Sequence, residues 1–167
     1  MLIFSIIMKK DTMVNKYKIV ENFLPSDIFK EIQKIITFEI PYFYKKGNGS
    51  LKMDDLYHFV HFLYSENTIR SHFFEKLLTP IMTRIEHTSI IRAKVNCYPS
   101  TETQYTHAKH KGLIFHINNN NGYTILEDGT KIKSIENRAV FFDTSKLHQS
   151  TTCTDKHLRL NININYV

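Results

Sequence analysis

The hydrophobic positions in the first half of the chain follow two helical patterns. After Pro25, isoleucine and phenylalanine recur every three or four residues as far as Ile36, which predicts one amphipathic helix. The same spacing recurs over 71–85 and predicts a second helix, which Pro80 should kink or interrupt. Two further segments of this half predict strands, 16–23 and 57–64.

From Ser89 onward the period changes from helical to two, the spacing of a strand with two unlike faces. Two helices followed by about seven short strands predict an α+β fold that is mainly β, in which the strands close on each other. No repeat or low-complexity linker divides the sequence, so we expect a single domain over 1–167. The predicted strands are 89–98, 113–117, 123–127, 131–135, 139–142, 147–152 and 157–167, with a polar loop at 100–111.

The N-terminal eight residues, MLIFSIIM, are apolar but too short for a signal peptide with its flanks or for a bilayer span. We expect 1–15 to be an extension, an added edge strand, or a stretch upstream of an alternative start. No other stretch approaches 18 apolar residues, and the two cysteines fit a reducing compartment. The expectation is a cytoplasmic protein, in the host cytoplasm if it is viral, without a membrane segment.

The composition adds a basic balance, with 22 lysines and arginines against 16 acidic residues and a net charge of +6. The lysines are scattered and do not interleave with aromatic residues, which favours a solvated surface and argues against nucleic-acid binding. The nine histidines are more informative. Three of them crowd into one short stretch, His107, His110 and His116.

The C-terminal segment HLRLNININYV alternates more regularly than any other part of the chain. If Cys153–Lys156 forms a turn, His148 pairs with Asn161 and Ser150 pairs with Arg159, and cross-strand partners share a face. An imidazole in such a patch can ligate a metal, and a guanidinium can hold a carboxylate through two hydrogen bonds. The spacing therefore suits a metal whose co-ligand is a dicarboxylate.

The chain resembles the iron(II)/2-oxoglutarate-dependent oxygenases, specifically the small prolyl-hydroxylase-like proteins of phages and marine microbes. The resemblance implies a double-stranded β-helix, or jelly roll, with the N-terminal helices packed on one sheet. The matching stretches cover most of the chain: Asn22–Ile36, Arg92–Glu102, His110–Ile132 and Glu136–Tyr166.

The resemblance also assigns site residues. The distal iron-binding histidine of the family maps onto His148, and its arginine for the far carboxylate of 2-oxoglutarate maps onto Arg159. Tyr98 stands where such enzymes often place a hydroxyl near the cosubstrate, and Asn161 shares the polar face of Arg159. The implied cofactors are iron(II) and 2-oxoglutarate, with ascorbate as an optional reductant.

The remaining iron ligands depart from the family pattern. A facial triad takes two histidines and one carboxylate, the first two as His-any-Asp or His-any-Glu, yet no acidic residue lies between Glu102 and Glu127. If His110 is the ligand, a glycine replaces the carboxylate, as in the halogenases of the superfamily, where chloride takes the vacated position. If His107 is the ligand, Lys109 puts an ammonium against the iron. A third reading is a degenerate metal site.

Two functions follow. The first is an iron(II)/2-oxoglutarate dioxygenase, an oxidoreductase that hydroxylates a protein side chain or a small molecule. It would use His148, one of His107 and His110 as metal ligands, and Arg159 as the cosubstrate anchor. The second is a jelly-roll binding module that has lost iron. The expected partners are 2-oxoglutarate and a protein or small-molecule substrate that the sequence does not name.

Overall fold

Strands dominate the computed structural model, which describes residues 17–46, 57–100, 104–107 and 111–167, with the backbone alone at 104–107 and 111. The helices are α1 (Ser26–Phe38) and α2 (Phe74–Met82). The strands are β1 (Tyr17–Val20), β2 (Phe43–Lys46), β3 (Tyr57–Ser65), β4 (Thr68–Ile69), β5 (Ile90–Pro99), β6 (Gln104–His107), β7 (Lys111–His116), β8 (Tyr123–Ile125), β9 (Lys131–Lys133), β10 (Arg138–Asp143), β11 (His148–Thr151) and β12 (Leu158–Tyr166).

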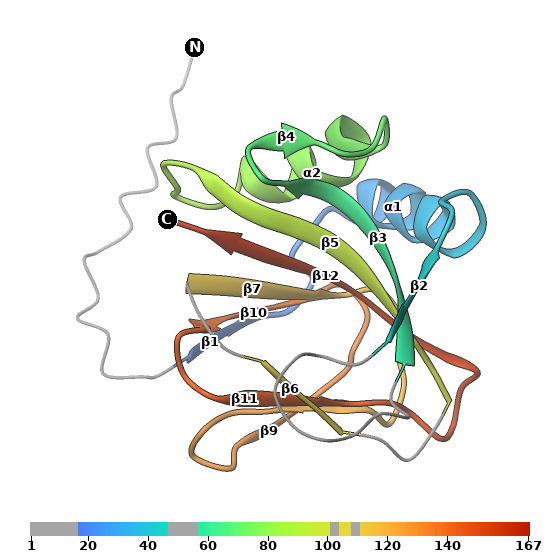
Figure 1. Cartoon of the computed structure of the whole chain (residues 1–167), viewed down its shortest axis with the longest axis vertical. Coiled ribbons are helices and arrows are strands. Elements are labelled where there is room, and N and C mark those ends of the chain that lie inside the picture. Colours follow the sequence, from blue (N-terminus) through green and yellow to red (C-terminus); the bar gives the residue numbers. More distant parts are fainter. Residues whose placement is uncertain (1–16, 47–56, 101–103, 108–110) are drawn as a thin grey trace.

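The strands form two antiparallel sheets that face each other (Figure 1). The large sheet has the order β1-β10-β7-β12-β5-β3-β2, with β4 paired to β3. The small sheet has the order β6-β11-β8-β9. From β5 onward the chain crosses repeatedly between them, so β5, β7, β10 and β12 lie in the large sheet and the strands between them lie in the small one. The prediction of a mainly β fold with two helices is confirmed.

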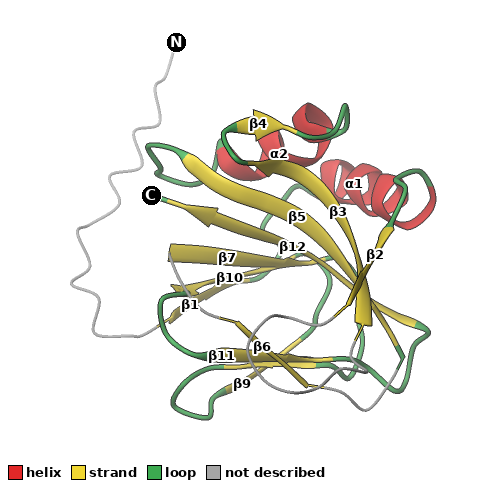
Figure 2. Cartoon of the chain, in the orientation of Figure 1, coloured by secondary structure: helices red, strands yellow, loops and turns green. Residues whose placement is uncertain are grey.

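Both helices cover the face of the large sheet that points away from the small sheet (Figure 2). Helix α1 buries Phe29, Ile32, Ile35 and Ile36, the stripe predicted from the sequence. These side chains join the core with the apolar side of the central strands, including Val95, Phe115 and Ile162. The hydrophobic effect thus fixes which face of the sheet the helices cover.

The other face of the central strands is polar, yet it is also buried. On β12, Arg159 is 0% exposed and Asn161 is 2% exposed, because this side faces the small sheet rather than water. A strand that is buried on both faces and polar on one of them cannot be an ordinary surface strand. This inward polar face positions the candidate site.

Three details differ from the sequence predictions. The stretch predicted as a polar loop at 100–111 contains β6, because its backbone pairs with β11 at the edge of the small sheet. Helix α2 is shorter than the predicted 71–85 and keeps Pro80 within its last turn. Strands β11 and β12 do not pair with each other and lie in different sheets.

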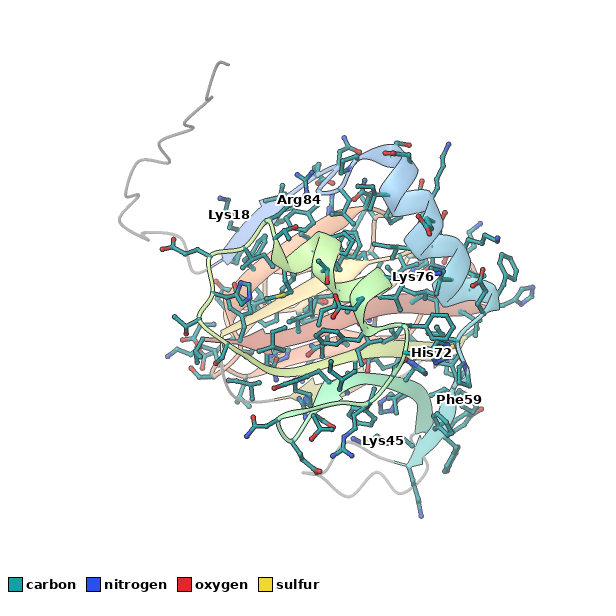
Figure 3. All side chains as sticks on the ribbon, turned by 90° about the horizontal axis from the view of Figure 1, so that it is seen from above. Lys18, Lys45, Phe59, His72, Lys76 and Arg84 are labelled. Carbon is teal, nitrogen blue, oxygen red and sulfur yellow. The ribbon has the colours of Figure 1, made fainter. Side chains whose placement is uncertain are left out.

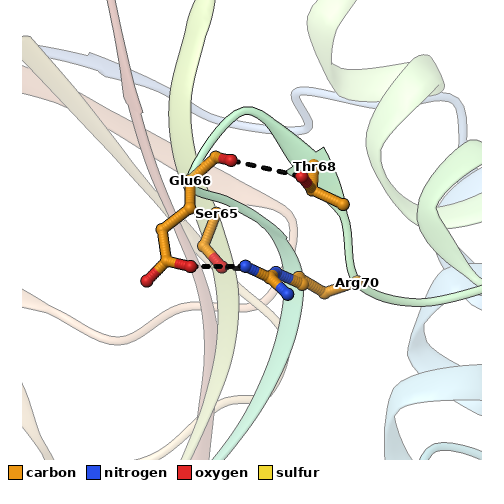
Figure 4. Close-up of polar contacts among 4 residues, drawn as sticks. All are labelled: Ser65, Glu66, Thr68 and Arg70. Carbon is orange, nitrogen blue, oxygen red and sulfur yellow. Dashed lines mark hydrogen bonds and ion pairs between the residues drawn. The ribbon is translucent and has the colours of Figure 1, made fainter.

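The β3–β4 hairpin is closed by its own side chains (Figure 4). Glu66 and Asn67 both have positive φ, at 53° and 55°, as the two central residues of a tight hairpin turn require. The Thr68 hydroxyl donates to the Glu66 carbonyl oxygen at 3.2 Å, and the Arg70 guanidinium pairs with the Glu66 carboxylate. In the part of the chain that is described, no helix has the length and apolarity needed to cross a bilayer.

Candidate functional site

A polar cavity lies between the two sheets, on the inward face described above. Its walls come from four strands and one connection, which are far apart in the sequence. The lining residues are Arg92, Lys94, Asn96 and Tyr98 on β5, Ile114 on β7, Thr144 after β10, His148 and Ser150 on β11, and Asn161, Asn163 and Asn165 on β12.

The predicted pairing of His148 with Asn161 and of Ser150 with Arg159 is wrong. In the ladder, Asn161 pairs with Asn96 and His116, while His148 pairs with His107. A hairpin is excluded because β12 takes its two partners from the large sheet. His148 and Asn161 nevertheless line one cavity, since the inward faces of the two sheets look at each other.

His148 is held in a defined orientation at this cavity. Its Nδ1 lies 3.1 Å from the carbonyl oxygen of Lys146, and a carbonyl only accepts, so Nδ1 carries the proton and Nε2 carries the lone pair. The ring meets Phe142 edge-on with centroids 4.9 Å apart. Burial lowers the pKa of His148, opposed by the bond to Lys146, so the ring is neutral near pH 7. A neutral, oriented imidazole is a suitable metal ligand.

The register sets two of the three metal-ligand candidates, His148 and His107, opposite each other. His107 is the last residue of β6, and its backbone pairs directly with that of His148. Directly opposed residues in an antiparallel pair have Cα atoms about 4.5–5.5 Å apart. The side chain of His107 and the whole of His110 lie outside the described residues.

The donor groups of the described residues do not complete a three-ligand iron centre. Among the described residues there is no group of three histidine, cysteine, aspartate or glutamate side chains that could hold a metal. The described part of the cavity lining contributes one histidine and no acidic residue, and its charged members are Arg92 and Lys94. A facial triad needs a carboxylate to offset part of the metal's charge. Arg92 and Lys94 instead add positive charge, which repels a metal ion.

Arg159 lies behind the cavity rather than on its lining. Its Nε donates to the Ser134 hydroxyl at 2.7 Å, one Nη to the Thr151 carbonyl at 3.1 Å, and the other to the Thr124 hydroxyl at 3.2 Å. All three acceptors belong to β8, β11 or the residue after β9, on the side of the small sheet. Arg159 therefore links the two sheets while it is fully buried.

Tyr98 lines the cavity and contacts Arg159. The guanidinium carbon of Arg159 lies 5.6 Å from the centroid of the Tyr98 ring, a cation–π contact, and the ring of His58 stacks on Tyr98 with centroids 5.3 Å apart. Tyr98 is 2% exposed. The structure thus places Tyr98, Asn161 and His148 on the cavity, with Arg159 next to Tyr98.

Sequence reasoning missed a buried lysine on the cavity lining, Lys94. Lys94 is 4% exposed, and burial together with the like charges of Arg92 and Lys45 lowers its pKa to about 7. The alternation along β5 is visible in the sequence, but alternation alone does not show that the polar face lies inward. The available signal was that β5 and the C-terminal strand both alternate strongly, and two such strands side by side present one common polar face.

No protein-family model matches this chain. No curated protein matches its sequence. A prolyl hydroxylase from Trichoplax adhaerens, in complex with a hypoxia inducible factor oxygen degradation domain peptide fragment, matches at TM-score 0.62 and 15% identity over 92% of this chain and 84% of that one. A Pseudomonas putida prolyl-4-hydroxylase matches at TM-score 0.64 and 10% identity, over 94% and 96%.

A viral collagen prolyl hydroxylase from Paramecium Bursaria Chlorella virus-1, as its 2OG complex, matches at TM-score 0.60 and 15% identity, over 91% of this chain and 96% of that one. The fold is that of the prolyl hydroxylases. At these identities the likeness establishes the fold alone. The chemistry of the cavity follows from the residues of this chain.

Proposed function

We propose that this protein belongs to the iron(II)/2-oxoglutarate oxygenase superfamily, has the jelly-roll winding of that superfamily, and binds a small dicarboxylic acid of the 2-oxoglutarate type. The observation that carries the proposal is the cavity between the sheets, which is lined by two cations and four asparagines and by no acidic side chain among the described residues. Such a lining favours an anionic, hydrogen-bonding ligand over an apolar one.

Binding without oxygenase turnover is the form of this function that the donor set supports best. Among the described residues, the lining offers His148 as an oriented ligand but no carboxylate, and the Lys94 ammonium and Arg92 guanidinium line the same cavity. Cations this close weaken the binding of a divalent metal. The solved viral hydroxylase holds 2OG, which makes this acid the first ligand to test.

Catalytic oxygenation of a protein side chain or small molecule is the second candidate. One specific observation favours it, since the register of β6 and β11 sets His107 across from His148. Two histidine ligands would leave more open positions on an iron(II) ion than the usual triad does. Iron bound there would supply the oxidising chemistry, while the chain would orient the cosubstrate and exclude water.

A paired measurement separates these candidates. Calorimetric titration with 2-oxoglutarate, in the presence of a chelator, should show saturable binding. Anaerobic iron(II) titration in the presence of 2-oxoglutarate, followed by exposure to oxygen, should release no succinate above the rate of the His148→Ala variant. Succinate release that His148→Ala abolishes would establish the oxygenase. The absence of binding by 2-oxoglutarate, succinate and related dicarboxylates would refute the proposed function.

A further inference from the structure

The inner face of β5 carries two cations, Lys94 and Arg92, for which the described residues provide no acidic partner. Lys94 points inward because its neighbours Ala93 and Val95 are fully buried in the core under the helices, and alternate residues of a strand take opposite faces. Its ladder partners are Asn163 on β12 and Phe62 on β3. Arg92 lies on the same face, two residues before Lys94, toward the more exposed end of the strand.

The charge of Lys94 lacks a counter-ion in the described structure. No hydrogen bond or ion pair of its ammonium occurs among the described residues, and its charged neighbours, Arg92 and Lys45, have the same sign. His58, which also senses Lys94, is neutral because burial first and then the two lysines lower its pKa to about 3. A buried cation without a partner is costly, and a bound anion removes that cost.

The asparagines around Lys94 supply what an oxyanion needs besides charge. The Asn96 amide donates to Asn161 Oδ1 at 2.9 Å, which fixes both side chains in the cavity wall. Asn163 and Asn165 line the cavity beside them, and their amides take part in none of the hydrogen bonds between described residues. Amide N–H groups that face a cavity can donate to a carboxylate without adding charge.

Arg159 is less suited to binding a ligand carboxylate than the family resemblance implies. Three of its nitrogens already donate to Ser134, Thr151 and Thr124, and it does not reach the cavity lining. Lys94 lies on that lining and has its donors available there. The geometry points to a new assignment: we propose that Lys94 and Arg92 form the anion-binding site of the cavity and hold a carboxylate without a metal ion.

This assignment rests on the proposed function and deepens it by naming the anchoring residues. The test is calorimetric titration of the full chain in a metal chelator, with 2-oxoglutarate, succinate and inorganic phosphate as separate probes. Lys94→Met should weaken binding of the preferred acid at least tenfold. Arg92→Gln, a change at an exposed position, should weaken it severalfold. Lys76→Met is the matched control, because Lys76 is exposed on α2, on the outer side of the large sheet seen in Figure 3, and should bind within twofold of the parent.

A second readout separates a ligand role from a structural one. Without ligand, Lys94→Met should unfold at a higher temperature than the parent, because it removes an uncompensated buried charge. Addition of the preferred dicarboxylate ligand should then raise the unfolding temperature of the parent and of Lys76→Met, but not that of Lys94→Met. A residue needed only for folding would lower the unfolding temperature when it is replaced.

Each outcome bears on one hypothesis. If 2-oxoglutarate binds equally well to the parent and to Lys94→Met, the assignment is wrong and the proposed function stands. If only phosphate binds and Lys94→Met abolishes its binding, the anion site stands and the dicarboxylate function fails. If none of the three probes binds, or if binding requires a metal, the assignment is overturned.

Discussion

Arg159 is a charged residue placed entirely inside a β-sandwich, and its hydrogen bonds explain why it is tolerated there. The guanidinium presents several fixed donors, and three of them meet acceptors contributed from the small sheet's side of the molecule. The Tyr98 ring covers another side of it. The residue therefore fastens the two sheets together, whether or not a ligand reaches it.

We expect Arg159→Ala to lower the free energy of unfolding by about 3 kcal/mol or more, because it leaves buried acceptors unpaired and opens a cavity. Urea denaturation followed by circular dichroism measures this loss. Arg84→Ala, at an exposed position after α2, is the control and should change stability by less than about 0.5 kcal/mol. An Arg159→Ala variant as stable as the parent would contradict the linking role.

His116 is a second buried polar residue, and it differs from Arg159 in its hydrogen bonding. It is 0% exposed, and neither ring nitrogen has a hydrogen-bond partner among the described residues. Burial, then the charges of Arg159 and Arg138, lower its pKa well below the usual value, so the ring is neutral.

We expect His116→Leu to raise the free energy of unfolding at pH 7 by about 1 kcal/mol, since it removes unsatisfied buried atoms. Chemical denaturation of the variant, compared with His72→Leu at an exposed position, checks this.

At the scale of elements, one asparagine joins the first helix to the sheets. Asn137 precedes β10 with φ at 56°, a left-handed conformation that asparagine tolerates. Its side-chain oxygen accepts from the Leu24 amide at 2.9 Å, its side-chain amide donates to the Leu24 carbonyl at 2.8 Å, and its own carbonyl accepts from Phe23 at 2.9 Å. These bonds fix the chain between β1 and α1.

We expect Asn137→Ala to destabilise the protein by about 2–3 kcal/mol, from the loss of two buried hydrogen bonds and the strain of a left-handed alanine. Hydrogen exchange should show the loss in α1 and β1 before it appears in β12. Asn119→Ala, which removes one exposed bond to the Glu136 amide, should cost less than 1 kcal/mol. Equal effects of the two variants would show that Asn137 does not hold α1 in place.

At the scale of the whole molecule, the buried histidines make stability depend on pH. The folded pKa of His58 is about 3, and those of His61, His116 and His148 are also below the ordinary 6.5. Below about pH 6.5 the unfolded chain binds protons that the folded chain does not, so the free energy of unfolding falls as the pH falls. Each pKa unit of difference is worth about 1.4 kcal/mol per group.

We therefore expect the urea midpoint to decrease steadily from pH 7 to pH 5, and the decrease to be smaller in His116→Leu. Lys94 also makes the free energy of unfolding rise with pH, but over a higher pH range. Its folded pKa of about 7 lies below its ordinary 10.5, so between those values the unfolded chain holds a proton that the folded chain has lost. Denaturation curves at pH 5, 6, 7 and 8 test the first expectation. A midpoint that is the same at pH 5 and pH 7 would show that these histidines are not buried as described.

The sequence by itself determined the helix α1, the succession of short strands and the class of fold, because these depend on periodicities that local residues carry. It also picked out Tyr98, His148 and Asn161, which line the cavity, although the pairing used to connect His148 with Asn161 was wrong. The tertiary structure alone decided the rest. Which sheet each strand joins is a matter of long-range packing, so only the folded chain turns the polar faces of β5 and β12 inward and brings Lys94 into a cavity with His148.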